Sequence, residues 1–133
     1  GKIELSLGRD MKDRKKISER TRKKRRATTN FKVIKRYKGF TLLEIRPETG
    51  RTHQIRVHLA SIKHPIVGDP VYGKQTIPLN IPQRVVKCLK DLRGQMLHAK
   101  SLEFTHPITG KRMEWVSPYP KDMEEILKIL DKE

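Results

Sequence analysis

The spacing of apolar residues predicts a β-strand at the start of the chain. In residues 1–8, GKIELSLG, the aliphatic residues Ile3, Leu5 and Leu7 occupy every second position. Successive side chains of a strand point to opposite faces, so these three residues would share one face. We therefore expect a short strand whose aliphatic side packs on a core.

Two further strands are predicted over residues 30–37 (NFKVIKRY) and 40–46 (FTLLEIR), which are rich in β-branched and aromatic residues. Lys38-Gly39 lies between them, and a two-residue connection containing glycine is typical of a β-hairpin. The following residues, PETG, end the second strand because proline cannot donate to a β-ladder.

Helical spacing begins after this turn, and we predict a helix over residues 52–62. Three aliphatic residues lie within about 60° of one another on this helix and are expected to pin it to the sheet: Ile55, Leu59 and Ile62. Arg56 would then lie at the edge of the apolar face, and Gln54 and His58 would lie on the far flank of the helix.

The second half of the chain predicts a loop, a hairpin and a terminal helix. Residues 63–73 contain two prolines and two glycines, which favour a shaped loop, and residues 85–92 suit a short helix. Residues 96–104 and 111–116 are expected to form a hairpin across THPITG. Residues 120–133 form a helix with aliphatic residues at helical spacing, namely Met123, Ile126, Leu127 and Leu130. This order of elements predicts an α+β fold with a largely antiparallel mixed sheet and flanking helices.

Length and charge narrow the class of protein. The chain has 133 residues, which favours a single domain over residues 1–133. Its 31 Lys and Arg residues against 15 Asp and Glu residues give a net charge of +16, which favours a polyanionic partner over a merely solubilising surface. Without amphipathic basic segments or an apolar run of roughly 20 residues, we expect no membrane contact.

The single cysteine, Cys88, excludes an internal disulfide, and no Cys or His residues have zinc-ligand spacing. Both observations fit a reducing compartment, and no signal-peptide pattern is present at the N-terminus. We therefore expect a cytoplasmic protein that binds no metal.

Half of the net charge lies in residues 9–26, which hold eleven Lys or Arg residues and three Asp or Glu residues. Only Met11 and Ile17 there are suited to burial. We expect a mobile basic loop over about residues 9–29 that orders on a polyanion, the alternative being a solvated linker. Four consecutive cations are the candidate phosphate contacts: Lys23, Lys24, Arg25 and Arg26.

The segment GRTHQIRVHLA, residues 50–60, concentrates hydrogen-bonding side chains at the start of the predicted helix. A helix N-terminus exposes free backbone N–H groups and so favours an anion. The candidate binding residues are Arg51, Thr52, His53 and Gln54. We expect Arg56 to be half-buried and paired with a carboxylate or a phosphate.

The alternatives for this segment are structural. Arg56 would then form an ordinary ion pair, and His53 and His58 would satisfy local hydrogen bonds. The two histidines are five residues apart, so they do not present a zinc pair on one helix face.

Three sequence blocks carry a resemblance to a known family. They are LLEIRPETG, GRTHQIRVHLASIKHPIVGDPVYG and MLHAKSLEFTHPITGKRMEW, within roughly residues 40–73 and 96–118. Together they strongly resemble the C-terminal signature of the RluA-type pseudouridine synthases, which isomerise uridines in ribosomal and transfer RNA. The resemblance implies a curved antiparallel sheet, an RNA-filled cleft, and no metal or organic cofactor.

The resemblance also implies a mechanism. Enzymes of this family flip the target uridine out of its stack, and an aspartate attacks it. The glycosidic bond breaks, and the base rotates and rejoins through carbon 5. A tyrosine stacks on the base, and a basic residue pairs with the aspartate. By resemblance, the basic residue of the Q-I-R motif maps onto Arg56. This assignment suits the predicted helix, because an arginine held at the edge of a core keeps a neighbouring carboxylate ionised.

The chain departs from the family pattern in two motifs. It has neither the H-R-L-D motif that carries the aspartate nor the Y-x-A motif that carries the tyrosine. Asp69 is expected to cap a turn, and Tyr72 and Trp115 are expected to be core or turn residues. We therefore predict that the chain is the C-terminal portion of one catalytic domain and that it is inactive alone. Its exposed sheet edge would allow self-association.

Three other functions fit the sequence less well. A stand-alone basic RNA-binding module without activity is the main alternative, and an upstream H-R-L-D motif would exclude it. A DNA-binding module is disfavoured because no helix-turn-helix or zinc-finger pattern is present. A hydrolase is disfavoured because no serine or cysteine stands in a nucleophile elbow.

Overall fold

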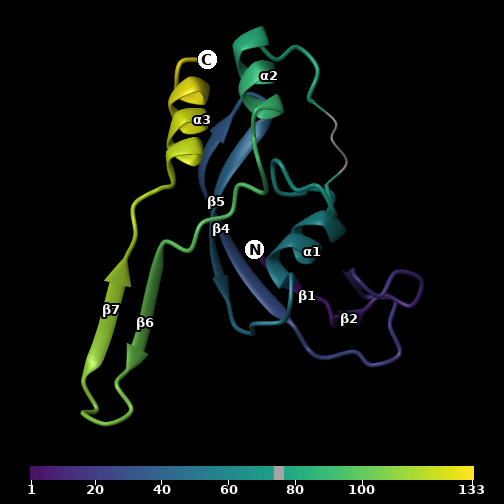
Figure 1. The fold of residues 1–133 in the computed structure, drawn as a ribbon, viewed down its shortest axis with the longest axis vertical. Helices are drawn as coiled ribbons and strands as arrows, with labels where there is room; N and C mark the ends of the chain where they lie inside the picture. Colours follow the sequence, from purple (N-terminus) through teal and green to yellow (C-terminus); the bar gives the residue numbers. More distant parts are fainter. Residues whose placement is uncertain (74–76) are drawn as a thin grey trace.

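The computed structural model describes residues 1–73 and 77–133 and contains three antiparallel sheets and three helices in those ranges (Figure 1). The central sheet has the order β1-β4-β5, formed by β1 (Lys2–Glu4), β4 (Thr28–Tyr37) and β5 (Phe40–Pro47). Two small sheets pair β2 (Gly8–Arg9) with β3 (Ile17–Ser18) and β6 (Ser101–Thr105) with β7 (Arg112–Val116). The helices are α1 (Gln54–Ser61), α2 (Gln83–Lys90) and α3 (Lys121–Asp131). The predicted α+β class, with antiparallel sheets and flanking helices, is confirmed.

The long β4–β5 hairpin is the scaffold for the rest of the chain. Tyr37 pairs with Phe40 across the predicted turn, where Gly39 has a φ of 80° that a side chain would disfavour. β4 begins two residues earlier than predicted because Thr28 and Thr29 are fully buried and continue the ladder. α1 lies beside this hairpin, and α2 and α3 lie together near its turn (Figure 1).

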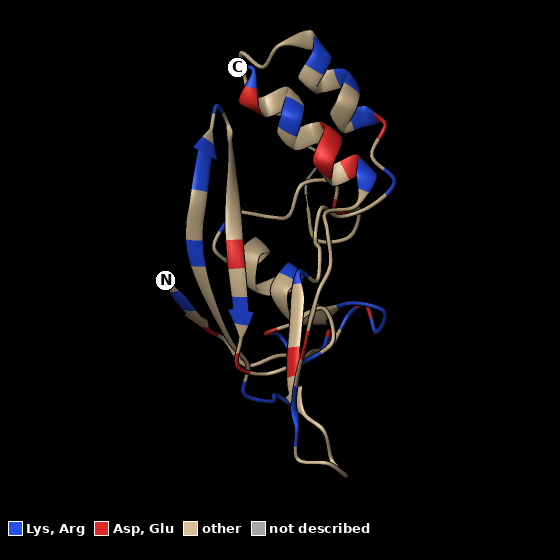
Figure 2. Ribbon diagram, turned by 90° about the vertical axis from the view of Figure 1, so that its left-hand side faces the viewer, with Lys and Arg blue, Asp and Glu red and all other residues tan. Residues whose placement is uncertain are grey.

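The basic segment contains short strands, so the prediction of one continuous loop over residues 9–29 is wrong, whereas its mobility stays a prediction. β2 and β3 form a short hairpin, and Leu7 and Arg25 exchange two backbone hydrogen bonds of 2.9 Å. Ile17 is buried in a cluster with Leu7 and Val57, which anchors the hairpin to α1, whereas Met11 is 56% exposed. We call residues 8–26 the basic hairpin; Figure 2 shows its cations along the ribbon.

Two apolar clusters hold the chain together. The first, beside α1, contains Leu7, Ile17, Ala27 and Val57, with Leu5 and Tyr72 packed against it. The second lies between α2, α3 and the turn end of β4–β5 and is built on Val85, Ile126 and Leu130. The predicted C-terminal helix is confirmed with Pro120 at its N-cap, and the predicted short helix is α2, two residues earlier than expected.

The β6–β7 hairpin extends away from the other elements (Figure 1). Leu102 pairs with Trp115 and Phe104 pairs with Met113, so these four side chains share one face. The rings of Phe104 and Trp115 stack with centroids 5.0 Å apart. Trp115 is 50% exposed and lies in a strand, so its predicted place in a core or turn is wrong. The predicted hairpin itself is confirmed, with a shorter first strand.

Candidate functional site

Arg56 and Asp69 form a buried, two-pronged ion pair. Nε and Nη2 of Arg56 each donate to one carboxylate oxygen of Asp69 at 2.8 Å. The Asp69 side chain is fully buried, and its Oδ1 also accepts from the backbone N–H groups of Val71 and Tyr72. Hydrogen bonds from Arg56, and then from those N–H groups, lower the pKa of Asp69 from 3.8 to about 2. Arg56 thus has the carboxylate partner that the sequence indicated, and Asp69 caps a turn.

Tyr72 joins this ion pair to the basic hairpin. The guanidinium carbon of Arg56 lies 5.0 Å from the centroid of the Tyr72 ring, which is cation–π geometry. The Tyr72 hydroxyl accepts from the Ile17 N–H at 3.0 Å and shares a hydrogen bond of 2.7 Å with Nδ1 of His53. Burial, and then the charge of Arg56, lowers the pKa of His53. The prediction that Tyr72 is a core or turn residue is confirmed. Nothing in the sequence indicated its contact with Arg56.

The backbone around the pair is locally constrained. His53 precedes α1 with a φ of 53°, a left-handed conformation that turns the chain into the helix two residues later than predicted. Gly68 has a φ of 78°, and a Cβ atom there would collide with the backbone of Gly94. The glycine therefore allows the loop to place Asp69 directly under Arg56.

Gln54, which we predicted to bind RNA, is buried with all of its amide group in use. Its Oε1 accepts from Thr49 Oγ1 at 2.6 Å and from the Arg51 N–H at 3.1 Å. Its Nε2 donates to the Thr28 carbonyl at 3.0 Å and to Thr29 Oγ1 at 2.9 Å. In this geometry Gln54 ties the turn before α1 to β4 and so fixes the position of Arg51.

The prediction that Gln54 and His58 lie on the outer flank of α1 is wrong. His58 is fully buried; its Nε2 lies 2.8 Å from the Leu5 carbonyl and its Nδ1 lies 2.8 Å from Thr29 Oγ1. A carbonyl only accepts, so Nε2 carries the proton and Nδ1 accepts from the hydroxyl. Of the three aliphatic residues predicted to pin the helix, Leu59 is buried but Ile62 is 38% exposed. Polar side chains with partners on β4 take the inward positions instead.

The remaining predicted binding residues are exposed. Thr52 and Arg51 lie in the turn before α1, and Arg51 Nε donates to the Arg26 carbonyl at 3.0 Å. That bond joins the turn to the exposed cations predicted to contact phosphates, which are Lys23, Lys24, Arg25 and Arg26. In the described part of the chain, none of these four forms an ion pair. The structure therefore gathers free positive charge around one end of α1, with Arg56 further inside.

Neither a metal cluster nor a membrane-spanning helix is found in the part of the chain that the structure describes. Over residues 1–73 and 77–133, no three His, Cys, Asp or Glu side chains are grouped to hold a metal ion. No helix in the same ranges is long and apolar enough to cross a bilayer.

Comparison with known proteins gives the family. Residues 1–61 match the family model described as RNA pseudouridylate synthase. The chain is 44% identical over 132 residues to the uncharacterised RNA pseudouridine synthase YlyB of Bacillus subtilis, covering 99% of this chain and 39% of that protein. It is 42% identical over 131 residues to the ribosomal large subunit pseudouridine synthase D of Pseudomonas aeruginosa, covering 98% and 41%. The chain belongs to the RluA-type RNA pseudouridine synthases, and it spans about two fifths of the length of these relatives.

Two solved human structures share the fold. RNA pseudouridylate synthase domain containing 1 superposes with a TM-score of 0.68 at 20% identity, covering 100% of this chain and 60% of that one. RNA pseudouridylate synthase domain containing 4 superposes with a TM-score of 0.67 at 24% identity, covering 98% and 56%.

Proposed function

We propose that this chain is the C-terminal portion of a catalytic domain that isomerises uridine to pseudouridine in ribosomal or transfer RNA, in the cytoplasm and without a cofactor. The observation that carries the proposal is the 44% identity over 132 residues to a pseudouridine synthase. The aligned region, which covers 99% of this chain, includes the block that contains the buried Arg56–Asp69 pair.

Arg56 is proposed to hold the nucleophilic aspartate, which this chain does not contain. Two of its nitrogens are bound to Asp69, and Nη1 has no partner among the described residues. Asp69 and the ring of Tyr72 fix the plane of the guanidinium, so Nη1 is available in one orientation for a second carboxylate. A cation at that position would lower the pKa of the nucleophile and keep it ionised.

The exposed face of the β6–β7 hairpin supports the proposal of a larger domain. Its four side chains are Leu102, Phe104, Met113 and Trp115, of which Leu102 is 61% exposed. An isolated two-stranded hairpin is marginally stable in water, and contiguous exposed apolar groups usually mark an interface. We propose that the rest of the catalytic domain covers this face, and that the chain alone self-associates through it.

Release of tritium from RNA that carries uridine labelled at carbon 5 tests the function directly. We expect no release from this chain alone, because it lacks the H-R-L-D motif, and release from a complete synthase that contains it. RNA binding by the chain alone is measured in parallel. Release by the isolated chain would mean that one of its own aspartates attacks the base, and the proposed division of the catalytic groups would be wrong.

The alternative is a stand-alone RNA-binding module without activity, favoured by the net charge of +16 and by the folded basic hairpin. Both readings predict RNA binding by the isolated chain. The two functions differ in what they predict for the complete protein. If the chain is a non-catalytic module, the complete protein should release no tritium.

Replacing Lys23, Lys24, Arg25 and Arg26 together by glutamine is expected to weaken RNA binding and its dependence on salt. Each lost phosphate contact removes roughly 0.7 from the slope of log K against log salt for single strands, so the slope should fall by up to about 3. Fluorescence anisotropy between about 50 and 200 mM salt measures this slope.

The matched control removes the same charge elsewhere, by replacing Lys87, Lys90, Lys121 and Lys132 on or beside α2 and α3 with glutamine. We expect a smaller change of slope there, because these residues lie far from the basic hairpin in the fold (Figure 1). An equal change in both variants would show that net charge alone governs binding and that the hairpin has no special role.

A further inference from the structure

The basic hairpin contains one carboxylate that its own structure does not use. Of its three acidic residues, Asp10 accepts from the backbone N–H groups of Lys12 and Asp13 at 2.8 and 2.9 Å. Asp13 accepts from the Lys15 N–H at 3.1 Å. The Glu19 carboxylate makes no hydrogen bond or ion pair with any residue that the structure describes. It is exposed among eleven cations, where a negative charge weakens attraction to a polyanion.

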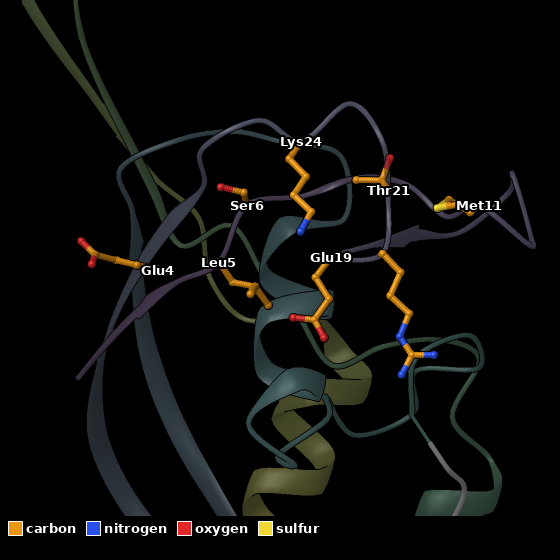
Figure 3. A pocket seen from close by; sticks show the side chains of 8 residues that line it. Glu4, Leu5, Ser6, Met11, Glu19, Thr21 and Lys24 are labelled. Carbon is orange, nitrogen blue, oxygen red and sulfur yellow. The ribbon is translucent and has the colours of Figure 1, made fainter.

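Glu19 lines an open pocket of about 560 Å³ between the end of β1 and the basic hairpin (Figure 3). Two cations, Arg20 and Lys24, line the same pocket, and its apolar groups come from Leu5 and Met11. Figure 3 shows Glu19 and Lys24 extending from the hairpin toward the same side. The volume lies within the roughly 300–1,000 Å³ of small-ligand sites, which is enough for one nucleotide.

We propose that this pocket binds a guanine nucleotide of single-stranded RNA and that Glu19 reads the base. A carboxylate is an acceptor only. Guanine presents two adjacent donors on its Watson–Crick edge, the N1–H and the N2 amino group, which match the two carboxylate oxygens. Adenine and cytosine present one amino group beside an acceptor, and uracil presents one N–H between two carbonyls. Only guanine therefore forms two hydrogen bonds with Glu19.

Four other groups of the pocket suit the rest of a nucleotide, whereas Glu4, which also lines it, points its carboxylate away from Glu19 (Figure 3). Lys24 and Arg20 supply the positive charge for its phosphate. The flexible thioether of Met11 and the side chain of Leu5 supply an apolar surface for the face of the base. This inference rests on the proposed RNA substrate and adds a preference for guanine in the strand that crosses the basic hairpin.

The test measures the affinity of this chain for single-stranded 12-mers that differ at one central position, which carries guanosine, inosine or adenosine. A two-pronged base contact is worth about tenfold in discrimination. We expect the guanosine strand to bind about tenfold more tightly than the adenosine strand, with inosine, which lacks the N2 amino group, in between. Glu19→Gln should abolish these differences without weakening the adenosine strand, since it removes a negative charge. Glu114→Gln, at an exposed position on β7, is the control that should retain them.

Equal affinity of the unmodified chain for all three strands would overturn the inference, as would equal weakening of all strands by Glu19→Gln. If binding is salt-dependent but indifferent to the base, the inference alone fails. If no RNA is bound, the proposed function fails with it. Guanosine monophosphate should compete poorly because it lacks the flanking phosphates, and competition as strong as that of the 12-mer would overturn the assignment to an RNA strand.

Discussion

Replacing Arg56 by alanine is expected to lower the free energy of unfolding of this chain by about 3–5 kcal/mol, because Asp69 would stay buried without its partner. Urea unfolding followed by circular dichroism measures the loss. Arg84→Ala is the matched control: Arg84 pairs with Glu133 but its side chain is 52% exposed, so the loss should be below about 1 kcal/mol. Similar losses for both variants would show that burial adds nothing to the Arg56–Asp69 pair.

The dependence of folding stability on pH provides an independent test of the Arg56–Asp69 pair. The folded pKa of Asp69, about 2, lies below its ordinary value of 3.8, so the carboxylate stabilises the folded chain above pH 4. This contribution, about 2 kcal/mol, is lost as the pH falls from 4 toward 2. The difference in stability between the unmodified chain and Arg56→Ala should therefore narrow in that range. A difference that is the same at pH 6 and pH 2.5 would show that the pair does not act through the charge of Asp69.

The elements that the sequence predicted correctly are those with strong local signals. The β4–β5 hairpin has β-branched strands and a glycine that accepts a positive φ, and α3 has aliphatic residues at helical spacing after a proline. In each case the residues that determine the secondary structure lie within the element itself. The same holds for the β6–β7 hairpin, whose turn is marked by proline and glycine.

The errors concern residues whose partners lie far along the chain. His58 was expected on the outer flank of α1, but its ring is held by the Leu5 carbonyl 53 residues earlier and by Thr29. A prediction from helical periodicity places every polar side chain on the exposed face, so it does not identify a polar group that is buried with hydrogen-bond partners. Gln54, which was expected on the same flank, is buried for the same reason, whereas its contact with RNA stays a prediction.

The basic hairpin shows the limit of arguments from composition. Its eleven cations favoured disorder, yet Ile17 in the first apolar cluster and the hydroxyl of Tyr72, 55 residues later, tie its backbone to α1. Arg56 was placed correctly at the edge of the core. Its partner Asp69 could not be foreseen from spacing, because the approach depends on the left-handed Gly68.

In the complete synthase, Arg56→Ala is expected to abolish turnover of uridine while RNA affinity stays nearly unchanged. The proposed reason is that the nucleophilic aspartate loses the cation that orients it and keeps it ionised. Loss of one preorganised donor of this kind costs about 10²–10³ in kcat, and the remaining Asp69 charge adds to the loss. Tritium release at saturating RNA measures kcat, and anisotropy measures affinity.

Two further variants separate this role from folding. Arg56→Lys keeps one charge beside Asp69 but lacks Nη1, so it should remain folded and still lose most of its turnover. Arg51→Ala removes an exposed cation near the basic hairpin, so it should weaken RNA binding yet retain kcat once RNA is saturating. Near-normal kcat in a folded Arg56→Lys enzyme would exclude the second carboxylate contact. Arg56 would then serve only to hold Asp69 and the turn that follows it.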